Sequence, residues 1–138
     1  TPTSPIFNYP YDRSRAALDQ MRKAEAWDPV HGLKMRYVNP VDGGWAMPTI
    51  GTCLQLLPKG FRGAPYQSTD ATVYVCTEGH GRTRVRGEVI DWGPRDIFVV
   101  PSWYETSHEA TEDAVLFSYS DRPIQEKLGL FREKRGNQ

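Results

Sequence analysis

The sequence predicts an all-β domain, a sandwich or barrel, with one helix before the strands and a short helix after them. Short runs rich in Val, Ile, Leu, Phe and Tyr alternate with Gly, Pro and Asp from Met35 onward. Two of these runs, 73–76 and 97–100, are apolar at every position, which is typical of strands covered on both faces. The length of 138 residues fits one domain.

The first part of the chain predicts an arm and a helix. Residues 1–11 are rich in Pro and Tyr and predict an extended arm. Apolar residues at helical spacing then predict an amphipathic helix over 12–24, capped by Asp12 and ended before Pro29. The clearest strand signals follow at 48–57, 72–78, 83–92, 96–100 and 114–120, with turns at 79–81 and 86–87.

The last part of the chain predicts a short helix and a polar tail. Asp121 is placed to cap this helix and Gly129 to end it. The tail over 132–138 is polar, and we expect it to be frayed. The chain then divides into an arm and connector helix at 1–34, a barrel core at 35–122, and a C-terminal helix and tail at 123–138.

Charge and composition exclude several classes of function. The 17 basic and 17 acidic residues give a formal net charge of zero, so we expect neither nucleic acid nor an anionic membrane as a partner. No apolar run is long enough to span a membrane, and no signal-peptide pattern opens the sequence. Cys53 and Cys76 lie in apolar runs and are interpreted as buried, reduced thiols of a cytoplasmic protein, although a disulfide stays possible.

Two frames of Gly and Pro, at 60–79 and 96–103, resemble the two signature motifs of the cupin superfamily, the small double-stranded β-barrels or jelly rolls. In that family two histidines, a glutamate and a third histidine hold a divalent metal in the barrel mouth. The corresponding positions here are Tyr66, Ser68, Thr72 and Thr106. Neutral hydroxyls are poor ligands for first-row divalent metals. We therefore expect no metal ligand and no catalytic residue in this chain.

His108 follows the third-histidine position by two residues. It is either a shifted metal ligand or general base, in an unusual site with Glu105 and Glu109, or a polar residue at the barrel rim. We favour the rim, because a single imidazole rarely holds a metal alone. His31 and His80 lie in a loop and a turn, and we expect both at the surface.

One further group of side chains is a candidate pocket. Tyr66, Trp103 and Tyr104, with His108 as a further candidate, could line a small aromatic pocket, although aromatic residues at a barrel mouth are more often packing than recognition. The alternating arginines at 82, 84 and 86 are interpreted as one solvated strand face.

Longer strings resemble a narrower family. The stretches at 34–40, 47–51, 56–62, 91–103 and 118–123 look like the C-terminal half of gentisate 1,2-dioxygenases. The resemblance extends from about Ser4 to Gly136, and salicylate and 1-hydroxy-2-naphthoate dioxygenases are close relatives. Position 1 is Thr rather than Met, so we expect a processed product, an engineered segment or a piece of a longer polypeptide.

The resemblance implies an oxidoreductase with two cupin barrels per subunit, usually a homotetramer, that cleaves the ring of a hydroxylated aromatic acid with dioxygen during aromatic catabolism. It places the Fe(II) cofactor in the N-terminal cupin, outside this chain, and makes residues 12–24 the connector between the barrels. The expected partners are that N-terminal half, other subunits and the aromatic acid. This chain alone is expected to be inactive and structural; the alternative is a free-standing barrel that binds a small aromatic acid.

Overall fold

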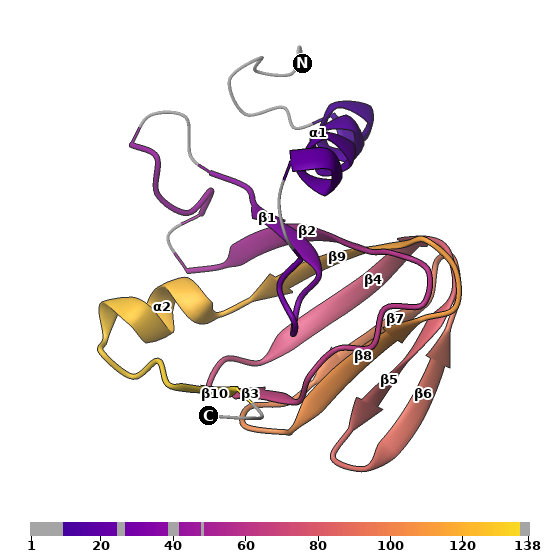
Figure 1. The fold of residues 1–138 in the computed structure, drawn as a ribbon. Helices are drawn as coiled ribbons and strands as arrows, with labels where there is room; N and C mark the ends of the chain where they lie inside the picture. The colour runs from indigo at the N-terminus through magenta and orange to yellow at the C-terminus, as the bar shows by residue number, and fades with distance from the viewer. Residues whose placement is uncertain (1–9, 25–26, 39–41, 48, 136–138) are drawn as a thin grey trace.

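The computed structural model describes residues 10–24, 27–38, 42–47 and 49–135, and its body is two five-stranded antiparallel sheets that face each other (Figure 1). The first sheet has the order β1-β2-β9-β4-β7 and the second the order β10-β3-β8-β5-β6. The strands are β1 (Leu33–Arg36), β2 (Gly51–Leu57), β3 (Tyr66–Ser68), β4 (Thr72–Glu78), β5 (Gly81–Val85), β6 (Glu88–Trp92), β7 (Ile97–Val100), β8 (Thr106–Ala110), β9 (Ala114–Ser120) and β10 (Glu133–Arg135). The predicted all-β fold, with an N-terminal helix and a short C-terminal helix, is confirmed.

The main core lies between the sheets, because every second side chain of a strand points to the same face. In β7, Phe98 and Val100 point inward and are 6% and 8% exposed. Their neighbours Ile97 and Val99 are 67% and 52% exposed. The prediction that the run 97–100 is covered on both faces is therefore wrong, since its outer face is open.

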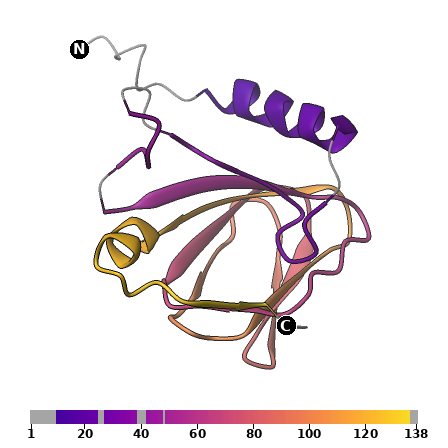
Figure 2. The same cartoon turned by 60° about the vertical axis from the view of Figure 1, so that its left-hand side comes forward.

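A second apolar core lies on the outer face of the first sheet. Leu54, Leu56 and Val115 point away from the barrel interior and pack with Leu18 of helix α1 (Tyr11–Ala24). Figure 2 shows α1 lying across the outer side of β1 and β2. The helix starts one residue before the predicted position, so Asp12 lies in its first turn rather than at its cap.

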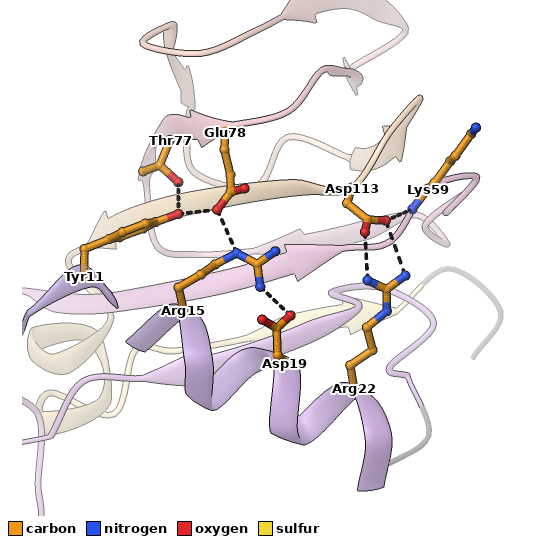
Figure 3. Close-up of polar contacts among 8 residues, drawn as sticks. All are labelled: Tyr11, Arg15, Asp19, Arg22, Lys59, Thr77, Glu78 and Asp113. Carbon is orange, nitrogen blue, oxygen red and sulfur yellow. Dashed lines mark hydrogen bonds and ion pairs between the residues drawn. The ribbon is translucent and has the colours of Figure 1, made fainter. Parts of the chain in front are cut away.

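Polar contacts fix the position of α1 along the sheet (Figure 3). The Tyr11 hydroxyl donates to Glu78 at 2.6 Å, and Arg15 Nε binds the same carboxylate at 2.7 Å. At the other end of the helix Arg22 binds Asp113 at 2.8 Å. Each partly exposed pair adds at most about 1 kcal/mol, so buried Leu18 carries most of the attachment and the pairs set the register. Residues 1–9 of the predicted arm lie outside the described residues.

Three strands of the second sheet carry little β signal in the sequence. Polar residues dominate β3, β8 and β10. The prediction of a frayed tail is wrong for Glu133–Arg135, because β10 pairs with β3 and Arg135 binds Asp28 at 3.0 Å. Residues 136–138 of that tail lie outside the described residues.

The turns and the C-terminal helix agree in part with the sequence. The run 83–92 contains two strands, joined by Arg86 and Gly87, both with positive φ, as a two-residue hairpin requires. The turn at 79–81 instead crosses from one sheet to the other. Helix α2 (Arg122–Lys127) is present, but the Asp121 side chain accepts a bond from Ala71 N and does not cap it. No described helix is long and apolar enough to cross a membrane.

Candidate functional site at the barrel mouth

The cupin motif positions come together in the structure. Tyr66 and Ser68 of β3, Thr72 of β4, and Thr106 and His108 of β8 line one cavity between the sheets. Its volume is about 30 Å³, which is room for a water molecule or two. The four positions that correspond to cupin metal ligands therefore surround one cavity. That cavity is too small for an organic ligand.

The side chains in this cavity do not fit a ferrous ion. The Tyr66 hydroxyl donates to Glu133 at 2.5 Å, and burial and this carboxylate raise its pKa, so the phenol is neutral. Ser68, Thr72 and Thr106 offer neutral hydroxyls, which first-row divalent metals bind poorly. Among the described residues no three His, Cys, Asp or Glu side chains are grouped closely enough to hold a metal ion.

His108 belongs to the core and not to the rim where the sequence placed it. Only 3% of it is exposed, and its Nδ1 lies 2.8 Å from the Thr83 hydroxyl. Trp92 Nε1 donates to that hydroxyl at 2.9 Å, so the Thr83 hydroxyl joins the two rings. Burial, with a smaller contribution from Lys34, lowers the pKa of His108 to about 3, which leaves a neutral imidazole at pH 7.

The structure does not bring the other proposed residues to His108. Glu109 alternates to the opposite face of β8, near Arg82 and Arg84, and Glu105 is exposed. Trp103 does not line the cavity and is 44% exposed.

Tyr104, the other aromatic residue predicted for the pocket, does line the cavity, and the Arg86 guanidinium lies 4.7 Å from the centre of its ring. His80 is exposed, as expected.

The sequence reasoning missed several residues of the site, among them the buried Asp70, which lines the cavity. His31, Lys34 and Arg122 line the cavity and also a larger cleft of about 430 Å³ that adjoins it. His31 was expected at the surface, yet its ring packs edge-on against Tyr66 with 4.8 Å between centroids, and burial lowers its pKa. Strand alternation would have found Lys34, because Leu33 faces α1 and the next residue must face inward.

The chain is similar to several ring-cleaving dioxygenases, although no family model matches it. It is 62% identical to "Gentisate 1,2 dioxygenase 1" of Aquipseudomonas alcaligenes, over 96% of this chain and 38% of that protein. The predicted resemblance to the gentisate 1,2-dioxygenase family is confirmed. The 5-aminosalicylate 1,2-dioxygenase of a Comamonas species is 38% identical, over 94% of this chain and 35% of that protein.

A solved structure supports the same family relationship. Salicylate 1,2-dioxygenase from Pseudoaminobacter salicylatoxidans, determined as an adduct with gentisate, superposes with a TM-score of 0.88 at 33% identity. The match covers 94% of this chain and 37% of that one, and it confirms the predicted cupin barrel. The chain thus spans less than two fifths of the length of these relatives.

Proposed function

We propose that this chain is the C-terminal, metal-free cupin of a gentisate 1,2-dioxygenase, with a structural and assembly role. In the full-length enzyme the N-terminal cupin would hold Fe(II) and cleave the ring of gentisate with dioxygen in the cytoplasm. The observation that carries the proposal is a combination: 62% identity to a gentisate dioxygenase, with hydroxyl side chains at all four positions where a cupin holds its metal.

The outer face of the first sheet supports the assembly role. Cross-strand pairing aligns two rows of side chains on this face. The rows are Val99, Val73, Tyr119 and Thr52, and Ile97, Val75, Phe117, Leu54 and Met35. Neither row contains a charged residue. Leu54 and Met35 already pack under α1, so the open part of the face is the part over β7, β4 and β9, about 10 Å of sheet, where Ile97, Val99 and Tyr119 are exposed. Uncharged apolar faces of this size mark protein interfaces.

An apolar groove extends this face toward α1. It has a volume of about 570 Å³, and Tyr37, Met47, Leu54 and Phe117 contribute to its walls. We infer that other parts of the full-length assembly, the N-terminal cupin or other subunits of a homotetramer, cover this face.

The alternatives are supported less well. A salicylate or 1-hydroxy-2-naphthoate dioxygenase is a weaker assignment, because identity falls to 33% and 32% for relatives with those names. A free-standing barrel that binds an aromatic acid through Tyr66, Trp103 and His108 is disfavoured, because the cavity holds only about 30 Å³ and Trp103 lies outside it.

The reading frame that encodes the chain tests the proposal first. We expect an upstream cupin with the three histidines of the metal motif; a frame without one would overturn the proposal. The assembly role is tested in the full-length enzyme by Val99→Lys, with Val89→Lys as the matched control, since Val89 is 46% exposed on the other sheet. Analytical ultracentrifugation is expected to show smaller species for the first variant only, and an unchanged assembly would refute the assembly role.

A further inference from the structure

His31, which lines the large cleft, and its neighbour Gln55 carry buried polar atoms without partners among the described residues. His31 Nδ1 and Gln55 Oε1 are buried and have no hydrogen-bond partner within the described part of the chain. The two residues touch, because Gln55 Nε2 donates to the His31 carbonyl at 3.0 Å. Lys34 lies opposite Gln55 in the β1–β2 register, on the same face. Buried polar atoms without partners indicate a missing water or ligand.

Of the four Lys and Arg side chains on the cleft wall, Lys34 and Arg36 have no carboxylate partner among the described residues. Each carboxylate on the cleft wall already forms an ion pair or accepts a hydrogen bond. The pairs are Asp28 with Arg135, Glu126 with Arg122 and Trp45, and Glu133 with Tyr66. No described residue makes a hydrogen bond or ion pair with the Lys34 ammonium, although it lines both the cleft and the inner cavity. An anion entering the cleft therefore meets the Lys34 ammonium, and the competing carboxylate without a partner among the described residues is Asp70, which is 8% exposed and lines the inner cavity.

The cleft also has an aromatic wall of fixed orientation. Trp45 Nε1 donates to Glu126 at 2.8 Å, and the Arg36 guanidinium lies 4.5 Å from the Trp45 ring centre. These two contacts hold the indole in place. A volume of about 430 Å³ falls within the range of small-molecule sites.

We propose that this cleft binds a small aromatic carboxylate, with the carboxylate on Lys34 and the ring on the Trp45 side. His31 Nδ1, unpaired at the back of the cleft, is available to a hydroxyl of the ligand or to a bridging water. The site requires no metal in this chain.

Calorimetric titration of this chain with salicylate at pH 7 tests the proposal. We expect saturable binding of one equivalent, and at least tenfold weaker affinity for Lys34→Met, which removes the charge and keeps most of the stem. Lys59→Met is the matched control, because the Lys59 side chain points away from the barrel (Figure 3), and its affinity is expected to equal that of the wild type. Thermal unfolding of each variant confirms that the fold is kept.

Two further ligands and one independent measurement complete the test. Salicylamide, which lacks the carboxylate, and inorganic phosphate, which lacks the ring, are both expected to bind at least tenfold more weakly than salicylate. Amide and indole NMR shifts on titration are expected to concentrate at His31, Lys34 and the Trp45 indole N–H.

Three results would overturn the proposal. The first is an absence of saturable heat and of localised shifts up to 10 mM salicylate, which would leave only ordered water at the unpaired atoms. The second is equal binding of salicylate and phosphate, which would indicate a general anion site. The third is an unchanged affinity in Lys34→Met. None of these results depends on iron or on an upstream cupin, so they leave the proposed function unaffected.

Discussion

Replacing Thr83 by valine removes the hydroxyl that joins Trp92 and His108 in the barrel core. Thr83 is fully buried and Trp92 and His108 are each 3% exposed, so bulk water has little access to the groups that lose their partner. Valine has nearly the same shape as threonine, so the change deletes hydrogen bonds without opening a cavity. The variant leaves two buried groups unpaired, the Trp92 indole N–H and His108 Nδ1.

Each unpaired buried polar group costs about 1–3 kcal/mol, so Thr83→Val is expected to lower the free energy of unfolding by about 2–6 kcal/mol. That is a large part of the ~5–15 kcal/mol of a typical domain. Urea unfolding followed by tryptophan fluorescence measures it, with an unchanged m-value showing that the native state is intact.

The matched control is Thr52→Val, because the Thr52 hydroxyl makes no hydrogen bond with the described residues and faces the apolar outer groove. We expect it to change stability by less than about 0.5 kcal/mol. If Thr83→Val costs no more than this control, the hydrogen-bonded arrangement of His108 derived above is incorrect.

Three further predictions concern pH, the helix and one glycine. Burial lowers the folded-state pKa of His108 to about 3 and also lowers that of His31. Below the unfolded-state pKa near 6.5 only the unfolded chain takes up these protons, so stability falls from pH 6.5 to 5 by up to ~1.4 kcal/mol per pH unit for each histidine. In urea unfolding, His108→Gln is expected to remove the contribution of His108 to that slope. A stability that does not change with pH over this range would contradict the burial of both histidines as neutral rings. Leu18→Ala is expected to lower the free energy of unfolding by about 2–5 kcal/mol and Arg22→Ala by less than about 1 kcal/mol, because Leu18 is fully buried between α1 and the sheet while the Arg22 pair is partly exposed. Equal losses of stability in calorimetry would show that ion pairs hold the helix. Gly81→Ala places a Cβ 2.2 Å from the Glu109 carbonyl oxygen and is expected to lower stability by at least about 1–3 kcal/mol, whereas Gly44→Ala, which meets only the Asp42 side chain, is expected to be tolerated; similar melting temperatures for the two variants would contradict this packing.

The sequence predicts the strands of the first sheet far better than those of the second. The runs 72–78 and 114–120 agree with β4 and β9 at both ends, because their apolar and β-branched residues report burial directly. Strands β3 and β10 escape prediction because their residues are polar and their pairing joins positions 66–68 to 133–135. No local pattern reports a contact across that many residues.

The candidate site was likewise predicted in part. The cupin frame correctly places Tyr66, Ser68, Thr72 and Thr106 around one cavity, since the spacing of the motif encodes the strand geometry. The burial of His31 could not be predicted, because it results from packing against Tyr66 and from Gln55 on another strand. Trp103 was misplaced because its positive φ of 66° turns the chain just before β8.

Metal content tests the central claim most directly. The chain is incubated anaerobically with ferrous iron, freed of unbound metal by gel filtration, and examined for retained iron and for gentisate-dependent oxygen uptake. Because hydroxyl side chains occupy the four ligand positions, we predict well under 0.1 equivalent of retained iron and no oxygen uptake above the protein-free control. One equivalent of iron together with gentisate-dependent oxygen consumption would contradict the account of this barrel as metal-free and non-catalytic.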